Sequence, residues 1–281
     1  MLYFAGAISF WILAWLVNIW IARQNESKIL NLFPPILFGV SVMLIWEASV
    51  VDFEVSPVIL PPPSAIYYKF ISSVPILWGD FVQTALKGAL PGYLIGCGAA
   101  FFVSLIADKF RFFARGVLPI GNFLAAMPII GIAPILVMWY GYGWQSKAAV
   151  VAVMVFFPIL VNTVQGMKMS DEIHKDLMQT YNANYLQTLL KLRLATAMPF
   201  IFNGLKICTT LALIGAIVAE FFGSPIRGMG FRISTEAPRF ALDMVWAEIA
   251  VAAIAGSLFY GGIVLLEKWI TFWHPSQRGR A

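Results

Sequence analysis

Few residues of this 281-residue chain are placed to do chemistry. Its histidines, His174 and His274, have no acidic or thiol partners at the spacing of metal ligands, and Cys97 and Cys208 lie far apart in apolar stretches. No Gly-x-x-x-x-Gly-Lys-Ser/Thr sequence occurs, so the phosphate-binding loop of many ATPases is missing from this chain. The sequence therefore predicts no catalytic residue, no metal site and no cofactor held by this chain.

A transport site is indicated instead by prolines and glycines inside an apolar stretch. The stretch contains Met127-Pro128-Ile129-Ile130-Gly131-Ile132-Ala133-Pro134, which should interrupt a helix repeatedly. Lipid cannot bond the freed carbonyls, so such a helix should be buried against protein or line a water-filled cavity. Broken helices often form transport sites, although a purely structural kink is the alternative.

The composition indicates that the surrounding elements lie in lipid. Hydrophobic residues make up 60% of the chain and charged residues only 12%, against roughly 25% charged residues in soluble domains. A soluble fold could not bury that much apolar surface. We interpret the net charge of +5 as a membrane orientation signal rather than nucleic-acid binding, because the basic residues lie between the apolar stretches.

Seven apolar stretches are long enough to cross a bilayer, so we predict an all-α, polytopic membrane helical bundle of about seven transmembrane helices. They are approximately Leu2–Ala22, Asn31–Val51, Phe81–Ala107, Gly116–Tyr140, Ser146–Gly166, Pro199–Phe222 and Val245–Thr271. With the N-terminus outside, most Lys and Arg residues fall inside, which favours this orientation. Lys206 falls within a span and is expected to extend to the interface. A signal peptide is the alternative for the first stretch, but that stretch lacks a basic start.

Two polar connections and one stripe of small residues should organise the bundle. In the outer connection, residues 51–80, Ser64 follows three prolines and is expected to cap a short helix over Ile66–Phe70. The third span repeats a small residue every four positions, which lets a neighbouring helix approach closely. These residues are Gly88, Gly92, Gly96, Ala100 and Ser104.

The connection over residues 167–198, called the inner connection below, is rich in charged residues. Tyr181-Asn182-Ala183-Asn184-Tyr185 predicts a helix–turn–helix that bends at Asn182, because Asn tolerates the left-handed backbone. Apolar side chains would make this segment a docking surface, unless it packs on its own bundle. Those side chains are Tyr181, Tyr185, Leu186, Leu189 and Leu190.

Glu220 is the acidic residue whose position in a predicted membrane span most suggests a function. It ends the sixth span, where an acid is costly unless it is paired or hydrated. Arg227 and Arg232 are close enough in sequence to be its partners. The Gly223–Gly230 segment that follows should be irregular, and a re-entrant loop over the outer opening would fit it.

These segments together resemble the permease subunits of bacterial ABC importers, of the binding-protein-dependent type I family. The closest branch is similar to the nitrate, sulfonate, taurine and bicarbonate permeases and includes those for thiamine precursors and riboflavin. The resemblance covers roughly Leu60–Ile270. It is carried by Leu60-Pro61-Pro62-Pro63-Ser64-Ala65, Met127–Pro134, Trp139-Tyr140-Gly141, Phe157–Thr163 and Val218–Ser224.

The resemblance implies a cytoplasmic signature of Glu-Ala-Ala, then Gly, then Leu-Pro, whose helices seat in an ATPase subunit. Asp176-Leu177-Met178 matches its start, Asn182 its glycine and Leu194-Ala195 its end, while the two alanines and one proline are absent here. The expected ATPase-coupling residues are Asp176, Leu177, Met178, Tyr181, Asn182, Tyr185 and Leu194. The expected translocation pathway is formed by Met127, Pro128, Gly131, Pro134 and Glu220.

The resemblance also implies partners. They are two ATPase subunits that bind ATP and Mg, a periplasmic or lipid-anchored substrate-binding protein, and a second permease copy or a paralogue. The expected location is the bacterial cytoplasmic membrane, and no nucleic acid is expected. The expected divisions are N-terminal helices over residues 1–59, a permease core over 60–271 and a cytoplasmic tail over 272–281.

Two other classes of function remain open from the residues alone. A self-contained secondary transporter or channel would have inverted repeats and buried charge pairs in the spans. A membrane-embedded enzyme would need a cluster of acid, base or metal-binding residues. Arg227, Arg232 and Arg239 near the outer opening favour an anionic substrate, unless they pair with Glu220 and Glu236.

Overall fold

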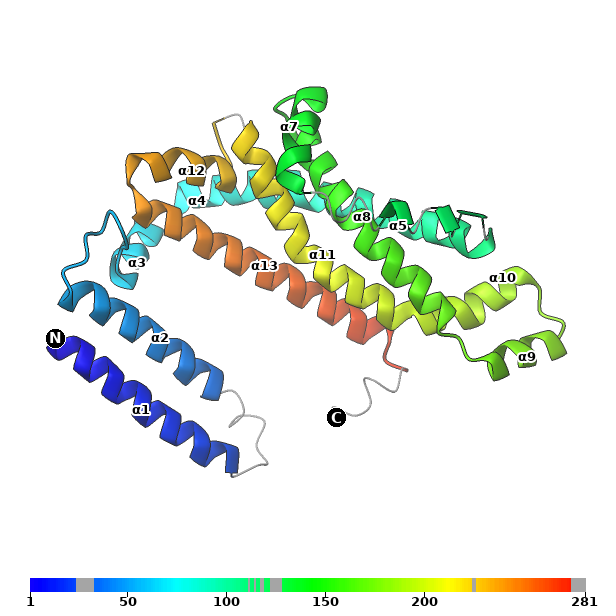
Figure 1. Cartoon of the computed structure of the whole chain (residues 1–281), viewed down its shortest axis with the longest axis horizontal. Coiled ribbons are helices and arrows are strands. Elements are labelled where there is room, and N and C mark those ends of the chain that lie inside the picture. Colours follow the sequence, from blue (N-terminus) through cyan, green and yellow to red (C-terminus); the bar gives the residue numbers. More distant parts are fainter. Residues whose placement is uncertain are drawn as a thin grey trace. The chain divides into compact units, whose positions relative to one another are not determined.

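The computed structural model describes residues 1–23, 33–110, 112–113, 115–116, 119–121, 128–223 and 226–273. Over these residues the chain is helical and contains no strand, as predicted (Figure 1). The α-helices are α1 (Leu2–Arg23), α2 (Phe33–Asp52), α3 (Pro63–Ser72), α4 (Val74–Phe81), α5 (Leu90–Lys109), α7 (Ile129–Tyr140), α8 (Trp144–Lys168), α9 (Glu172–Thr180), α10 (Tyr185–Thr188), α11 (Leu194–Phe222), α12 (Met229–Glu236) and α13 (Leu242–Ile270). Two π-helices, η2 (Val82–Ala89) and η3 (Leu189–Arg193), and the 3-10 helix η4 (Ala237–Arg239) join some of them.

Six helical runs in the described residues are long and apolar enough to cross a membrane. They are Leu2–Ile21, Phe33–Asp52, Val74–Lys109, Trp144–Lys168, Tyr185–Phe222 and Leu242–Ile270. The fourth predicted span differs, because its described helix α7 has only 12 residues and starts after Pro128. Pro134 lies inside α7 without ending it, so the helix begins after Pro128 and continues through Pro134, which donates no backbone hydrogen bond.

The chain divides into two units, and the first contains residues 1–77 and 233–249. In this unit α1 and α2 pack side by side. Asp52, at the end of α2, accepts a 2.7 Å hydrogen bond from the Phe4 amide at the start of α1, where amides lack helical partners. Large apolar side chains cover the exposed faces of both helices, which suits contact with lipid.

Ser64 does not cap α3, contrary to the prediction. The residue that precedes this helix is Pro62, which makes no capping bond through a side chain. Instead Glu47 of α2 accepts bonds from the Ser64 amide at 2.9 Å and the Ser64 hydroxyl at 2.7 Å. The helix start is thus capped by a carboxylate from a neighbouring helix, which also favours the positive end of the helix dipole.

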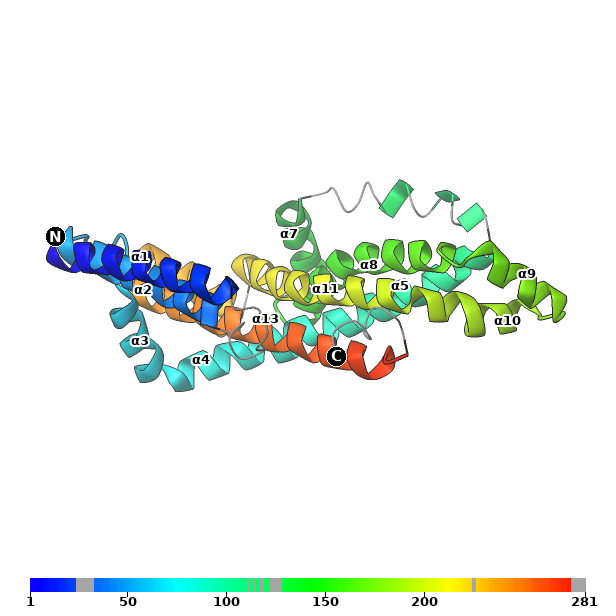
Figure 2. The same cartoon turned by 90° about the horizontal axis from the view of Figure 1, so that it is seen from below.

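The second unit contains residues 78–232 and the chain from Ala250 onward, and α5, α8 and α11 form its core. Figure 2 shows these three helices running alongside one another. The small-residue stripe is buried, with Gly88 on η2 and the other four residues on α5. A Cβ atom at Gly92 or Gly96 would collide with α8, at Val151 and at Val155 respectively. The stripe therefore serves close helix packing.

Lys206 of α11 does not reach for the interface, contrary to expectation. Its Nζ atom lies 2.9 Å from Glu267 Oε2 of α13, and both side chains are mostly buried. The two charges satisfy each other in an environment where an isolated charge would be costly.

Candidate functional site

The inner connection forms the predicted helix–turn–helix. α9 ends at Thr180, and Asn182 adopts the left-handed conformation with a φ of 49°, so the predicted bend is confirmed. Asn184 then starts α10 with a capping box, in which its side chain accepts from the Gln187 amide and its own amide donates to the Gln187 side chain. η3 continues α10 directly into α11. Both views show α9 and α10 at one end of the second unit (Figures 1 and 2).

One face of α9 is an exposed apolar stripe. Ile173, Leu177 and Tyr181 follow one another at four-residue spacing and are 74%, 50% and 77% exposed. Residues four apart share a helix face, so the three side chains form one surface. Leu186 and Leu190 beyond the turn are exposed as well, whereas Leu189 is buried in the core, so its expected place on the surface was wrong.

The other predicted coupling residues lie on α9, in the turn, on α10 and at the start of α11, where Leu194 packs against the core. Asp176 and Asn182 are exposed, Met178 and Leu194 are half-buried, and Tyr185 is partly exposed. The structure therefore brings the predicted coupling residues into one segment with an apolar surface. A monomeric soluble protein rarely leaves such a patch uncovered, and the function of the patch remains a prediction.

A carboxylate on α5 anchors the inner connection, and the sequence analysis did not identify it. Asp108, in the last turn of α5, accepts from Arg193 Nη1 at 3.0 Å (Oδ1) and 2.8 Å (Oδ2). Its Oδ2 also accepts from the Tyr185 hydroxyl at 2.9 Å. Asp108 precedes Lys109 near the end of an apolar helix. Nothing in this local sequence indicated that its carboxylate would bond Tyr185 and Arg193, which lie 77 and 85 positions away.

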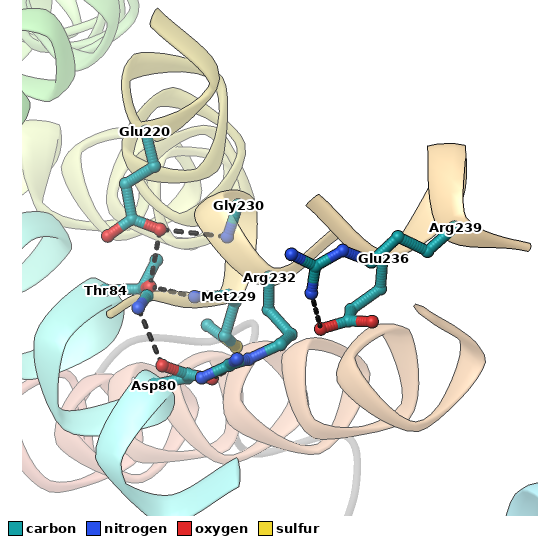
Figure 3. A network of polar contacts seen from close by, with 9 residues as sticks. Asp80, Thr84, Glu220, Met229, Gly230, Arg232, Glu236 and Arg239 are labelled. Atoms are coloured by element: carbon teal, nitrogen blue, oxygen red, sulfur yellow. Dashed lines mark hydrogen bonds and ion pairs between the residues drawn. The ribbon is translucent and has the colours of Figure 1, made fainter. Parts of the chain in front are cut away.

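A second polar cluster surrounds Glu220 and the start of α12 (Figure 3). Three successive amides point at three side chains from other elements, and these contacts satisfy amides that a helix start leaves free. The Gly228 amide donates to Asp80 Oδ1 (2.7 Å), the Met229 amide to Thr84 Oγ1 (2.8 Å) and the Gly230 amide to Glu220 Oε2 (2.9 Å). The positive end of the α12 dipole also favours the two carboxylates.

Among the residues that the structure describes, the ion pairs seen for three arginines do not include Glu220, contrary to expectation. In the described part of the chain, the Glu220 carboxylate accepts hydrogen bonds from Thr84 and Gly230. Arg232 instead donates from Nε to Asp80 Oδ2 at 2.8 Å. Arg239 lies 3.5 Å from Glu236. A helix start and a hydroxyl compensate for the burial of the acid.

Lys147 lies in the first turn of α8 and is fully buried, with a 0% exposed side chain. Among the described residues its Nζ atom has no hydrogen-bond partner, although the Glu220 charge acts on it electrostatically. A Cβ atom added at the stripe position Gly88 would lie 3.3 Å from the Cβ atom of Lys147.

The predicted pathway residues fall into two places. Met127 lies outside the described residues, Pro128 immediately precedes α7, and Gly131 and Pro134 lie on it. Gly131 is exposed, with open space where a Cβ would be. Glu220 turns to η2 and α12, so the structure does not join it to the α7 residues.

A groove of about 540 Å³ lies between α5, α7 and α8. Its lining is apolar and includes Gly96 of the stripe together with Ile132 and Trp139 of α7. α7 packs through Ala133 and Leu136 against Val150 of α8 and Ala219 of α11, and Leu136 also lines the groove. α7 is thus held by one face, while Ile130 and Met138 remain exposed.

Comparison with known proteins relates the whole arrangement to one family. A family model described as binding-protein-dependent transport system inner membrane component matches residues 92–272. The chain is 31% identical over 247 residues to a Haemophilus influenzae protein named "Probable ABC transporter permease protein", a match that covers 86% of this chain and 98% of that protein. The formylaminopyrimidine transport permease protein ThiX of Halalkalibacterium halodurans is also 31% identical, over 86% of this chain and 96% of its own. The taurine transport system permease protein TauC of Escherichia coli is 27% identical, over 83% and 86%.

Proposed function

Because the chain belongs to the family of binding-protein-dependent transport system inner membrane components, we propose that it forms the translocation pathway of an ATP-driven importer in the bacterial cytoplasmic membrane. Its relatives are ABC transporter permeases, so the role of a multi-pass transport subunit follows from the family. The proposal adds a site for the ATPase, a pathway and a class of solute.

The ATPase docks on the inner connection. The observation that carries this step is the exposed stripe of Ile173, Leu177 and Tyr181 on α9. Apolar side chains at four-residue spacing are what an amphipathic helix inserts into a groove of a partner. Beyond the turn at Asn182, α10 continues without a break into the long helix α11, so a force on α10 reaches the membrane part of the chain.

The complete importer contains two permease copies, or this chain and a paralogue, with two ATPase subunits and an external substrate-binding protein. ATP and Mg are bound by the ATPase subunits. Closure of these subunits around ATP moves the inner connection and shifts the membrane helices between an inward-open and an outward-open state. Such a shift requires only that the ATP-bound partner contacts one of the two states more favourably.

The solute is small and either anionic or heterocyclic, by analogy with relatives named for taurine and formylaminopyrimidine. The arginines near the outer opening do not favour an anion, since Arg232 pairs with Asp80 and Arg239 lies beside Glu236. Thermal-shift measurements of the partner binding protein with taurine, bicarbonate, riboflavin and formylaminopyrimidine will decide the solute.

The docking site is tested with two single charges on opposite faces of α9. The chain is coexpressed with a candidate ATPase subunit from the same organism and purified through a tag on the permease. Leu177→Asp places a charge within the stripe and should abolish copurification of the ATPase. Gln179→Asp places the same charge off the stripe and should leave it intact. Equal recovery of the ATPase with both variants would overturn the docking site.

The pathway is tested at α7. Gly131→Cys puts a thiol where no atom occupies the space of a Cβ. A pathway position should react with a membrane-impermeant maleimide at a rate that changes when vanadate traps the ATPase with nucleotide. Reaction at one unchanged rate in both states would remove Gly131 from the pathway.

A further inference from the structure

We propose that Asp108 is the positioning residue that makes α5 move together with the inner connection, so that the motion of the ATPase reaches α5 as well as α8 and α11, the two helices that the inner connection joins. This inference rests on the proposed function. α11 is joined to the inner connection by a continuous helical run from Tyr185 to Phe222. α5 ends at Lys109 and has no such covalent continuity with it.

The hydrogen bonds between the inner connection and α5 all end on Asp108, in the part of the chain that the structure describes. Tyr185 and Arg193, which donate these bonds, stand at the two ends of the α10–η3 segment. A rigid helical segment held at both ends by one carboxylate cannot turn relative to α5 without losing charge-assisted bonds. Lys109 adds a second contact, with its Nζ atom 5.9 Å from the centre of the Tyr185 ring.

The stability of α5 itself does not account for an acid at this position. Asp108 lies in the C-terminal turn, where the negative end of the helix dipole opposes a carboxylate. Its side chain is only 10% exposed, so water compensates little of that repulsion. The partners in the inner connection compensate it, which makes the carboxylate favourable only while the two segments stay together.

A link to α5 matters because α5 packs closely on α8 and lines the apolar groove beside α7. Its stripe residues Gly92 and Gly96 lie against α8 so closely that a single added methyl group would collide. α5 also lines the apolar groove beside α7. Movement of α5 with the inner connection would therefore act on α8 and on the groove from the α5 side. α11 packs on α8 and α7 but contributes none of the described residues that line the groove.

Distance measurements by pulsed electron paramagnetic resonance test the link. Spin labels are placed at Phe102→Cys on α5 and Lys191→Cys on η3, both exposed positions, in a background with the buried Cys97 and Cys208 replaced by alanine. The reconstituted permease–ATPase complex is compared without nucleotide and trapped with vanadate, with labelled chains diluted by unlabelled ones. In the otherwise native chain the distance should be the same in both states, and in Asp108→Ala it should differ between them.

Three further variants separate positioning from simple stabilisation. Asp108→Arg with Arg193→Asp restores an ion pair and should restore the fixed distance, and Tyr185→Phe should loosen it partially. Asp243→Asn removes the acid of the exposed Lys69–Asp243 pair and should leave the distance fixed. If Asp108→Ala does not assemble with the ATPase, the other two variants test the role of Asp108. A distance that stays fixed in Tyr185→Phe, or one that changes in the charge-swapped variant, would overturn it.

The outcomes distinguish this inference from the proposed function. If the native chain does not assemble with an ATPase, the proposed function fails. If it assembles and its distance changes on trapping, or if Asp108→Ala keeps the fixed distance, only the role of Asp108 is overturned.

Discussion

The Thr84 hydroxyl donates a 2.8 Å hydrogen bond to Glu220 Oε2, although the two residues lie 136 positions apart. The same oxygen of Thr84 accepts the Met229 amide at 2.8 Å, so one hydroxyl joins η2, α11 and α12. A buried acid at the end of a membrane helix is thus held by a hydroxyl and a helix start (Figure 3). The first prediction concerns this hydroxyl.

Thr84→Val should destabilise the protein, because it keeps the shape of the side chain and removes both bonds. The Met229 amide and Glu220 would each lose a partner in a buried site, and a buried group without its bond costs about 1–3 kcal/mol. Thr84→Ser keeps the hydroxyl and should melt close to the native protein. The measurement is the thermal unfolding of detergent-solubilised protein, and equal melting of all three proteins would contradict the prediction.

Gly228→Ala should be destabilising for two reasons. Gly228 has a φ of 133°, which side-chain-bearing residues rarely adopt, and its Cβ would overlap the Glu220 carboxylate. Strain of this kind costs on the order of 1–3 kcal/mol. Gly261→Ala on α13, where the Cβ would meet no atom within 4 Å, is the control and should not lower the melting temperature.

Gly96→Ala and Gly98→Ala should have opposite effects, although they lie two positions apart on α5. A Cβ at Gly96 would lie 2.5 Å from Val155 Cγ2 and 2.6 Å from the Ala152 carbonyl oxygen, whereas Gly98 faces open space. Overpacking at Gly96 should cost about 1–3 kcal/mol, while Gly98→Ala should stabilise by up to about 1 kcal/mol. Thermal unfolding of both variants checks this, and a stable Gly96→Ala protein would show that α5 and α8 can separate without cost.

Asn182→Gly should preserve the inner connection and Asn182→Val should distort it. The left-handed turn at φ 49° is free of strain for glycine, whereas a residue with a Cβ pays roughly 1–2 kcal/mol there. Because Asn182 is exposed, we expect the global melting temperature to change little in either variant. Recovery of the copurified ATPase should fall only with valine, and a similar fall with glycine would point to a direct contact of the asparagine side chain.

Lys206→Met should be strongly destabilising, because it leaves the Glu267 carboxylate unpaired. Removal of one partner of a buried ion pair costs about 3–5 kcal/mol, whereas replacement of both by apolar residues is often neutral. Lys206→Met with Glu267→Leu should therefore recover most of the lost stability. A double variant as unstable as the single one would mean that the pair contributes net stability beyond mutual compensation.

Much of the fold followed from local patterns. Apolar length predicted most of the long helices, the four-residue spacing of small residues predicted the contact of α5, and Asn182 predicted its own bend. The resemblance to ABC permeases is confirmed by the family match over residues 92–272. These features depend on side chains near one another in sequence or on the period of a helix, which a sequence displays directly.

The polar contacts could not be predicted, because each joins distant segments. Arg232 was expected near Glu220 on sequence distance, but the fold gives it Asp80, which is 152 positions away. Glu47 caps α3 from another helix, whereas the local sequence had predicted Ser64 as the capping residue. Lys206 carried no sign of Glu267 as its partner. Residue type limits which groups can pair, and tertiary packing decides which of them meet.

The π-helix η2 makes chain length, more than side-chain identity, the sensitive property of this region. It lies between Asp80, which must face the start of α12, and Gly92, which must face α8. A π-helical turn contains more residues than an α-helical one. Loss of a single residue between Asp80 and Gly92 would rotate these two residues relative to each other by roughly 100° about the helix axis. Apart from the buried Thr84, Gly88 and Ala89, side chains within Val82–Ala89 should thus be exchanged with far less effect than the gain or loss of one residue, which would aim either the acid or the glycine at the wrong neighbour.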